Sequence, residues 1–505
     1  MIQHIASWPV LLPMLAAILL LMPPCGKSIP IRRVVSIVMS IITACVSVAL
    51  LISVYKNGPI VYAIGDWQAP FGIVLVADLL SVLMVALTSF LALAVALYSS
   101  VGDDEKGSFF HPLVHFLVLG VNGAFLTGDL FNLFVFFEVL LIASYALLMH
   151  AGDKHKTRAA LQYVILNLIG SSVFLIALGI LYGVLGTLNI ADMSLKVAQL
   201  QGDDVYLAKI GGLLLLVVFA LKGALLPLHL WLPNTYASAM PVVAALFAIM
   251  TKVGVYAMLR VYTVIFGENA GLLNHMAQPW LWGLAIATIV IGAIGVLAAQ
   301  DLRKLTANLV IVSVGTLVAL VAIQHVSATA ALLYYLVHST LVCAALFLLA
   351  DLISHQRGKV ADRLAPGRGV AQPVLLGICF IIAALAVVGM PPLSGFVGKI
   401  WILKTTLDSE RALVFWPVYL IASFALLVAL TRAGTSLFWE RKHQDREHPD
   451  EDNAKPVQVI AIVGLLAGSP LMVIFGGPIS EYMIAAATQL HDISTSINTV
   501  LKGGL

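Results

Sequence analysis

The sequence predicts an all-α membrane protein that crosses the bilayer many times. Of its 505 residues, 61% are hydrophobic and only 10% are charged, and the mean hydropathy is +1.02. A soluble domain usually carries about 25% charged residues, and a soluble protein this apolar would expose large aggregating patches. We therefore predict a polytopic protein of about fourteen transmembrane helices, with two inverted five-helix repeats and broken helices at spans seven and twelve.

The apolar runs give approximate limits for each span. A helix needs roughly 20 apolar residues to cross about 30 Å of hydrocarbon. The predicted spans are 4–23, 31–54, 72–100, 109–127, 129–150, 159–184, 207–226, 238–265, 277–299, 302–323, 328–352, 373–405, 412–438 and 456–476. The first run lacks a basic start and a small-residue cleavage site, so it is predicted to be a retained span. Residues 479–501 are predicted to lie at the membrane interface.

Lys and Arg residues in the loops predict the orientation, because cytoplasmic loops carry an excess of both. With the N-terminus outside, 18 of the 28 Lys and Arg residues fall on one side and 7 on the other, which leaves 3 within the spans. This bias predicts that both termini lie on the outer side of the cell membrane. It places the charged loop 441–455 in the cytoplasm as a solvated loop.

The remaining composition argues against several classes of site. The basic residues are scattered in short loops and form no nucleic-acid patch. The cysteines lie far apart without a CxxC motif, so neither a metal site nor a disulfide is predicted. The glycine pairs 211–212 and 476–477 are isolated and do not form a phosphate loop. We expect no cofactor.

Two spans contain an internal break, in ALKGALLPLHLWLP (220–233) and VVGMPPLSGFVGKI (387–400). Proline removes a backbone donor, and such a break persists at membrane depth only where protein or trapped water satisfies the freed groups. Both breaks read Pro-Leu-x-x-aromatic and lie five spans apart, so they cross in opposite directions. This spacing predicts inverted repeats with the functional centre at the broken helices. The predicted units are 1–107, 108–266, 267–440 and 441–505.

Five ionisable residues lie deep within apolar runs: Glu138, Lys222, Lys252, His338 and Lys399. A charge at the bilayer centre costs about 2.5–3.5 kcal/mol on insertion scales. These side chains are therefore predicted to face the bundle interior or water. A series of acidic and basic groups near the midplane is what a proton relay needs. The alternative is that the charges only hold helices together.

Glu138 and Lys222 are the central pair of this prediction. Glu138 lies roughly 15 Å into the fifth span, and Lys222 precedes the first break. Burial disfavours the lysine ammonium, whereas a nearby carboxylate favours it, so a Glu–Lys pair can be poised to exchange a proton near neutrality. The alternative is a static ion pair that joins two helices.

The other three residues extend the series. Lys252 lies in mid-span beside Gly254, which allows a neighbouring helix to approach closely. His338 titrates close to neutrality unless perturbed, although a lone buried histidine is often only a hydrogen-bonded core residue. Lys399 follows the second break by two turns and could end the relay.

Two further residues lie at the edges of the series. His229 lies inside the first break, where it is predicted either to gate water access or to cap freed carbonyls. Asp78 lies nearer a membrane interface and is predicted to be structural.

Four stretches of the sequence resemble a known family. They are TGDLFNLFVFFEVLLIASYALL (127–148), ALKGALLPLHLWLP, AIMTKVGVYAMLRVY and GMPPLSGFVGKIWIL (389–403). They look like the antiporter-like subunits shared by respiratory complex I and Mrp-type cation/proton antiporters. This resemblance implies fourteen helices, two inverted repeats and a proton pathway. It also implies an ion pair between Glu138 and Lys222, with Lys252 and Lys399 as the lysines of the eighth and twelfth spans.

Within that superfamily, details resemble the D-subunit branch of the Mrp complexes. Val314 stands where complex I relatives carry a histidine, and Lys399 where they often carry glutamate. Val342 stands where the largest such subunits carry a second lysine, which weakens the expected step at His338.

The predicted function is that of a transporter subunit rather than an enzyme. It would move protons in exchange for Na⁺ or another monovalent cation, together with the other subunits of an Mrp-type complex. The alternatives are a proton-pumping subunit of a complex I or hydrogenase assembly, and a structural scaffold.

Overall fold

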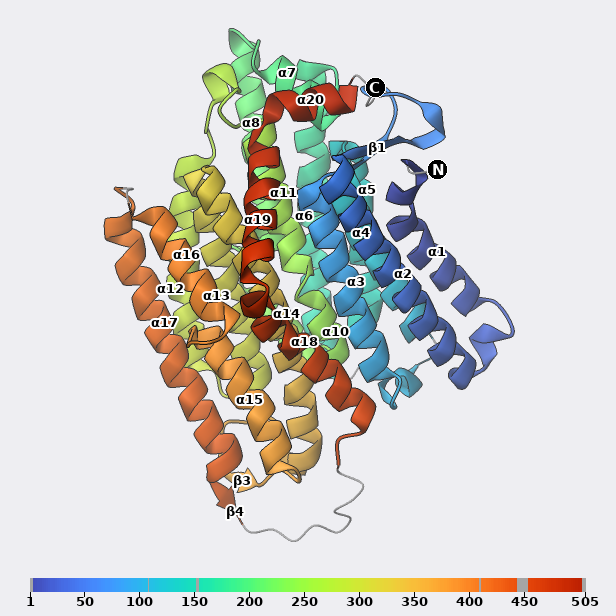
Figure 1. Cartoon of the computed structure of the whole chain (residues 1–505), viewed down its shortest axis with the longest axis vertical. Helices are drawn as coiled ribbons and strands as arrows, with labels where there is room; N and C mark the ends of the chain where they lie inside the picture. The colour runs from blue at the N-terminus through green and yellow to red at the C-terminus, as the bar shows by residue number, and fades with distance from the viewer. Residues whose placement is uncertain (1–2, 108, 151–153, 408–409, 443–452, 502–505) are drawn as a thin grey trace.

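The computed structural model describes residues 3–107, 109–150, 154–407, 410–442 and 453–501. Long helices run roughly side by side, and the short helices α7 and α20 lie across one end of the bundle (Figure 1). By length and composition, 11 described helices could cross a membrane, and three shorter apolar helices accompany them. The predominantly helical membrane fold is therefore confirmed, while the count of fourteen crossings stays a prediction.

The N-terminal part combines three helices with a β-hairpin. Its helices are α1 (Trp8–Leu21), α2 (Ile29–Asn57) and α3 (Leu79–Ser99), with 3-10 turns η1 (Gln3–Ala6), η2 (Cys25–Lys27), η3 (Ile64–Asp66) and η4 (Asp103–Lys106). Strands β1 (Ile60–Ala63) and β2 (Val74–Ala77) pair antiparallel, with Ile60 opposite Ala77. The predicted third span thus begins too early, because residues 74–77 form a strand and the Asp78 carboxylate caps α3.

The middle of the chain contains the two predicted repeats. The first holds α4 (Phe110–Leu126), α5 (Leu130–Met149), α6 (Lys154–Leu185), α7 (Ile190–Val197), α8 (Asp203–Gly223), α9 (Trp231–Ser238), α10 (Pro241–Phe247) and α11 (Met250–Val264). The second holds η5 (Gly271–Leu273), α12 (Gln278–Ala298), α13 (Leu302–Ile323), α14 (Val326–Arg357), η6 (Gly358–Val360), β3 (Gly367–Arg368), α15 (Pro373–Val388), α16 (Ser394–Thr406), α17 (Ala412–Gly434) and the π-helical turn η7 (Thr435–Trp439). The repeat boundaries stay a prediction.

Both predicted breaks are present. Helix α8 ends at Gly223 and α9 begins at Trp231, while α15 ends at Val388 and α16 begins at Ser394. At the first break, the Trp231 indole donates to the Leu221 carbonyl at 3.1 Å, and the Thr288 hydroxyl accepts from the Leu226 amide at 2.9 Å. Side chains therefore satisfy backbone groups that the break has freed, as membrane depth requires.

The eighth span is also interrupted, which sequence reasoning missed. Helix α10 ends at Phe247 and α11 begins at Met250. The residues between them, Ala248 and Ile249, include neither Gly nor Pro, so the sequence carries no break signal there. Lys252 consequently lies in the first turn of α11, directly after an interruption.

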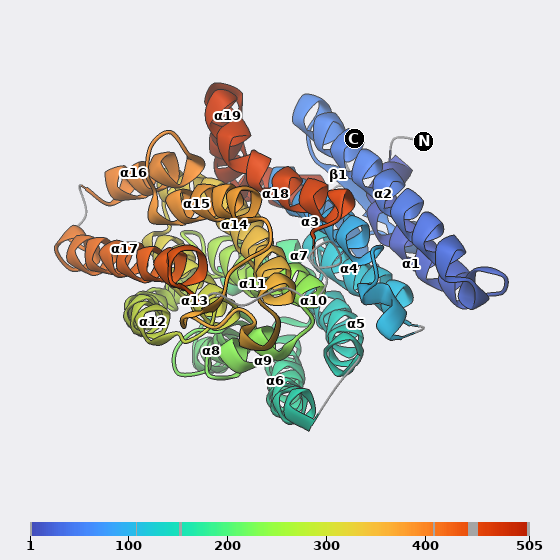
Figure 2. The same ribbon diagram turned by 90° about the horizontal axis from the view of Figure 1, so that it is seen from below.

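The most deeply buried helices are α3, α4, α10, α11, α13 and α14, and α14 lies near the middle of the bundle in the view from below (Figure 2). Viewed from below, α2, α6 and α17 lie on the rim around this centre (Figure 2). The rim helices expose apolar side chains such as Val34, Ile169 and Phe424, which is the pattern of a surface that faces lipid. The buried polar residues therefore lie in the interior of the bundle.

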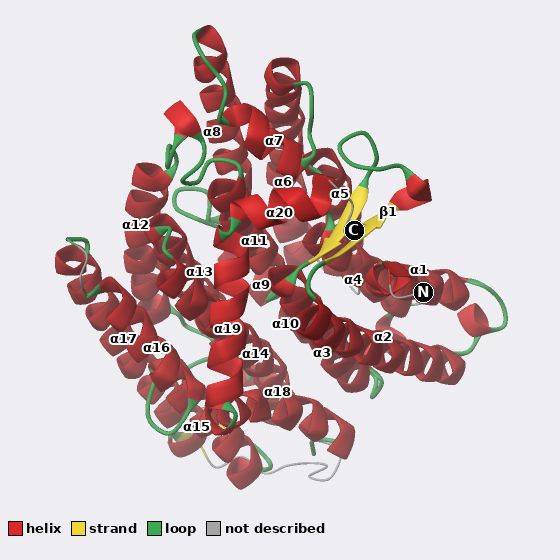
Figure 3. Ribbon diagram, turned by 45° about the horizontal axis from the view of Figure 1, so that its top comes forward, coloured by secondary structure: helices red, strands yellow, loops and turns green. Residues whose placement is uncertain are grey.

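The C-terminal segment is packed more closely than predicted. It comprises β4 (Arg441–Lys442), which pairs in parallel with β3, then α18 (Pro456–Ile474), α19 (Gly476–His491) and α20 (Ile493–Leu501). The Tyr482 hydroxyl donates to the Leu79 carbonyl at 2.7 Å, so α19 is docked on the bundle rather than lying at the interface. Within this C-terminal segment, α20 is the helix that lies across the end of the bundle (Figure 3).

Both described ends of the chain lie at the same end of the bundle (Figure 1). An even number of crossings requires this arrangement. The side of the membrane that they face stays a prediction. Most of the charged loop 441–455 lies outside the described residues.

Candidate functional site

Glu138 occupies the middle of α5 and is half-buried against α6. Its carboxylate accepts a hydrogen bond from the Ser171 hydroxyl of α6. The surrounding residues are apolar, and Phe137 packs against Phe174 and Phe219 on neighbouring helices. Ser171 therefore gives the carboxylate a neutral donor inside an apolar layer, where an unsatisfied oxygen would be costly.

Lys222 lies in the last turn of α8, immediately before the first break. Its Nζ donates to the amide oxygen of Asn167 at 3.0 Å, and the Asn167 amide nitrogen in turn donates to the Tyr163 carbonyl at 2.8 Å. The second hydrogen bond orients the amide so that its oxygen faces the lysine. The C-terminal end of a helix also favours a cation, so both features stabilise the ammonium.

The structure does not bring Glu138 and Lys222 into direct contact. The carboxylate contacts Ser171, and the ammonium contacts Asn167, with no ion pair between the two charged groups in this part of the described chain. Glu138 nevertheless lies close enough to Lys222 for the negative charge of its carboxylate to favour the lysine ammonium through space. The expected direct ion pair is thus replaced by two contacts on adjacent turns of α6.

Asn167 and Ser171 were missed by reasoning from the sequence. They are spaced by four residues on α6, so they lie on one helix face. Asn167 is fully buried and Ser171 nearly so. The signal was available in LNLIGSSVF, where two polar side chains recur at helical spacing in an apolar run. Because neither side chain is charged, the cost of burying a charge does not single out these two residues.

Lys252 is fully buried near the start of α11. Its Nζ donates to the Ser313 hydroxyl of α13 at 3.3 Å and to the Thr251 hydroxyl at 3.5 Å. The Cys343 thiol of α14 lies within electrostatic range. The lysine therefore has only neutral hydrogen-bond partners among the described residues.

Gly254 explains why α11 approaches α8 so closely. A Cβ at this position would lie 2.6 Å from the Gly223 nitrogen and 3.0 Å from the Lys222 carbonyl carbon. Both atoms belong to the backbone of α8 and cannot move aside. Glycine is therefore required where the two lysine-bearing helices cross, as predicted from the sequence.

His338 lies in the buried middle of α14 and belongs to a hydroxyl chain. Its Nδ1 is 2.7 Å from the Ser394 hydroxyl at the start of α16, and that hydroxyl is 2.8 Å from the Ser469 hydroxyl of α18. Such contacts suit either ring tautomer, because a hydroxyl both donates and accepts. Sequence reasoning did not anticipate Ser394 and Ser469, since their alignment depends on how three separate helices pack.

Lys399 lies on α16, and its side chain turns back toward the second break. Its Nζ donates to the Val388 carbonyl at 2.7 Å and to the Ser423 hydroxyl of α17 at 3.0 Å. Val388 is the last residue of α15, so the ammonium caps the end of the broken helix. Lys222 thus belongs to the last turn of the half-helix before the first break, and the Lys399 ammonium contacts the last turn of the half-helix before the second.

His229 and Asp78 lie away from this series. His229 is in the first break, and its Nδ1 is buried without a hydrogen-bond partner among the described residues. Its ring nitrogen Nδ1 therefore caps no freed carbonyl here. Asp78 forms a two-pronged ion pair with Arg260, which also contacts the Tyr256 hydroxyl at 3.0 Å. Arg260 counts as a loop residue in the predicted charge bias, but it lies on α11.

The arrangement consists of separate polar sites rather than one continuous contact chain. Electrostatic interactions connect Glu138 with Lys222 and His338 with Lys399, but no described hydrogen bond joins Lys222 to Lys252 or Lys252 to His338. A proton that moves between these sites needs bridging water. Within the described ranges, no group of three or more His, Cys, Asp or Glu side chains is arranged to hold a metal ion.

Comparison of the sequence with known proteins identifies the family of the chain. Residues 127–428 match the family model described as NADH:quinone oxidoreductase/Mrp antiporter, TM. The chain is 38% identical to the D subunit of the Na⁺/H⁺ antiporter of Bacillus subtilis (strain 168), over 98% of both chains. It is 37% identical to the D subunit of the probable K⁺/H⁺ antiporter of Rhizobium meliloti (strain 1021), over 99% of this chain and 98% of the relative.

A solved structure agrees with these relatives. A chain in the structure of the Mrp complex from Dietzia sp. DQ12-45-1b matches with a TM-score of 0.90 and 27% identity, over 99% of both chains. The resemblance to antiporter-like subunits carried by four sequence stretches, and the resemblance to D subunits carried by Val314 and Lys399, are thereby confirmed. The chain belongs to the NADH:quinone oxidoreductase/Mrp antiporter family of membrane proteins.

Proposed function

We propose that this chain is the proton-translocating subunit of a multisubunit cation/proton antiporter in the cell membrane. The complex would exchange protons for Na⁺ or another monovalent cation, and the chain acts as a transporter subunit rather than an enzyme. The observation that carries the proposal is the setting of Lys222. Its ammonium lies at a helix break, has the neutral acceptor Asn167, and is within electrostatic range of Glu138.

Neutral partners let a buried lysine change its protonation state. A lysine that loses its proton beside a carboxylate leaves an unpaired buried anion, which is strongly unfavourable. Asn167 leaves no such charge behind. Glu138 influences Lys222 through the field of its carboxylate, so protonation of Glu138 weakens the hold on the lysine's proton. The carboxylate thus controls the lysine without touching it.

The other buried groups continue this pathway. Lys252 has the neutral partners Ser313 and Thr251, and Lys399 has Ser423 and the Val388 carbonyl. His338 lies between them along the chain and is bonded to the Ser394 hydroxyl. We assign these residues to a relay through water, with His229 as the access gate at the first break. Both chain termini lie on the outer side in this scheme.

The partners of the chain are the other subunits of an Mrp-type complex. The sequence similarity to antiporter D subunits extends over almost the whole length, which favours this assembly. The alternative function is that of a proton-pumping subunit in a complex I or hydrogenase assembly. The matching family model leaves it open, because that model describes NADH:quinone oxidoreductase subunits as well as Mrp antiporter subunits.

One experiment separates these functions. The complex is expressed from its complete gene cluster in cells that lack their own antiporters, and everted vesicles are energised to form a pH gradient. Addition of Na⁺ or K⁺ should collapse the gradient in vesicles with this chain and not in vesicles where it is deleted. A gradient that ignores both cations, in vesicles that contain the assembled complex, would exclude the antiporter and favour the redox-linked assembly.

A further inference from the structure

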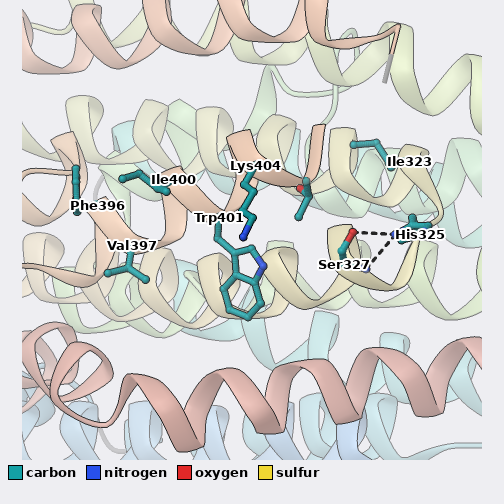
Figure 4. A pocket seen from close by; sticks show the side chains of 9 residues that line it. Ile323, His325, Ser327, Phe396, Val397, Ile400, Trp401 and Lys404 are labelled. Carbon is teal, nitrogen blue, oxygen red and sulfur yellow. Dashed lines mark hydrogen bonds between the residues drawn. The ribbon is translucent and has the colours of Figure 1, made fainter. Parts of the chain in front are cut away.

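A groove of about 940 Å³ lies beside α16, away from the buried lysines. One wall is the outer face of α16, and the opposite wall comes from the end of α13 and the start of α14 (Figure 4). Lys399, also on α16, is buried and does not line it. We call this feature the α16 groove and define it by Phe396, Val397, Ile400, Trp401, Lys404 and His325.

The polarity of the groove changes along α16. Val397, Ile400, Trp401 and Lys404 follow one another at spacings of three, one and three residues, so they share one face of the helix. The first two are aliphatic and exposed. Lys404 lies about 10 Å farther along the helix axis than Val397. The groove is thus apolar toward the middle of the bundle, and it becomes cationic toward the end that also holds both termini.

The cationic end has the chemistry of a head-group site. The Lys404 amine lies beside the Trp401 ring, and His325 lines the groove at the start of α14, next to Ser327 (Figure 4). The His325 ring is 2.8 Å from the Ser327 hydroxyl. None of the described lining residues is Asp or Glu. Tryptophan and lysine at the end of a span are typical of the level at which lipid head groups lie.

We propose that the α16 groove binds an anionic phospholipid, with an acyl chain along Val397 and Ile400 and the phosphate beside Lys404. Basic pockets between spans recognise such head groups. A transmembrane helix of a partner subunit fits less well, because its apolar surface would cover Lys404 and leave the ammonium in a dry apolar contact. The proposal rests on the membrane fold and is independent of the transport function.

The test measures lipid retention by the purified full chain with whatever subunits copurify. Detergent-purified samples are exchanged into phosphatidylglycerol or phosphatidylcholine with identical acyl chains, and bound lipid is counted by native mass spectrometry. Lys404→Gln should weaken phosphatidylglycerol retention about fivefold, the effect of one lysine near a membrane surface. Lys404→Arg should retain it, and Lys209→Gln, an exposed lysine of α8, serves as the matched control.

A second variant keeps the test decisive. Ile400→Trp fills the apolar part of the groove and should remove the bound lipid while Lys404 is still present. Equal weakening by Lys404→Gln and Lys209→Gln would overturn the proposal, because the attraction would then be diffuse. Equal retention of phosphatidylcholine would also overturn it. If Ile400→Trp instead releases a partner subunit and leaves the lipid count unchanged, the groove is a protein contact.

Discussion

The ammonium of Lys222 donates a 3.0 Å hydrogen bond to the amide oxygen of Asn167. The carboxylate that was expected to pair with it, Glu138, accepts instead from Ser171, one turn farther along the same helix α6. Helix α6 thus separates the acid from the base and supplies each with a neutral partner. In the proposed mechanism the acid acts on the lysine by its field, so the proton of Lys222 can leave without breaking an ion pair.

Asn167→Ala is expected to lower cation/proton exchange by at least tenfold. Hydrogen bonds to charged groups contribute about 1.5–3 kcal/mol, and the variant leaves a buried ammonium without this acceptor. Exchange is measured as the collapse of a pH gradient in everted vesicles, normalised to the amount of assembled complex. Ser172→Ala, at an exposed position on the same helix, should retain exchange. Equal exchange by both variants would remove Asn167 from the pathway.

His338→Gln separates a relay role from a packing role. Glutamine can still hydrogen-bond to Ser394, but it cannot carry a proton near neutral pH. We expect exchange to fall at least tenfold while the complex assembles normally. His115, a buried histidine of α4 that is 3.1 Å from the Ser36 hydroxyl, provides the control variant His115→Gln, which should remain active. Full activity of an assembled His338→Gln complex would make His338 a structural residue.

Gly254→Ala is expected to destabilise the folded chain by about 1–3 kcal/mol, because the added methyl group overpacks a helix crossing. The new Cβ would lie 2.6 Å from the Gly223 nitrogen. Unfolding temperature of the purified protein is the measurement. Gly179→Ala, on the exposed face of α6 with nothing within 4 Å of the added atom, should leave the temperature unchanged or raise it slightly. A harmless Gly254→Ala would contradict the observed closeness of α8 and α11.

Asp104, in the loop between α3 and α4, should make stability depend on acid pH. Burial alone would raise the pKa of its carboxyl group, but hydrogen bonds from Arg33 and His111 lower the pKa to about 2. An unfolded aspartate has a pKa of about 3.9. The ionised form therefore stabilises the fold above about pH 4, and this contribution is lost as the pH falls toward 2.

The check compares unfolding temperatures of the purified protein at several pH values. Asp104→Asn should be less stable than the parent at pH 7, and the difference should shrink between about pH 4 and pH 2. Glu105→Gln alters the exposed partner of Arg33 and should show a much smaller effect. A constant difference between parent and Asp104→Asn over the whole range would show that the ionised carboxylate is not the stabilising group.

The membrane spans could be predicted from the apolar runs, and the broken helices could be predicted from the positions of two prolines. The runs placed a helix in every predicted span, and Pro227 and Pro392 located both broken helices. The hairpin before α3 was missed because strand-forming and helix-forming apolar residues are alike in a hydropathy window. The interruption after Phe247 was missed because Ala248 and Ile249 carry no break signal. Docking of α19 depends on Tyr482 and Leu79, which are distant in sequence.

The candidate site was predicted in part. Burial of Lys222, Lys252, His338 and Lys399 follows from the cost of placing charge in lipid, and the structure agrees. Their partners could not be derived in this way, because a serine or asparagine costs little in an apolar helix and stands out less than a charge. Ser423 and Ser469 become partners only through the packing of helices far apart in the chain.

The proton role of Lys222 is tested most directly by the exchange activity of Lys222→Ala in an assembled complex. Vesicles with Lys222→Ala or with the exposed-lysine control Lys209→Ala are matched for complex content and energised to the same pH gradient. The relay requires that Na⁺ or K⁺ fail to collapse the gradient with Lys222→Ala and succeed with Lys209→Ala. Normal exchange by the assembled Lys222→Ala complex would contradict a proton pathway through this lysine.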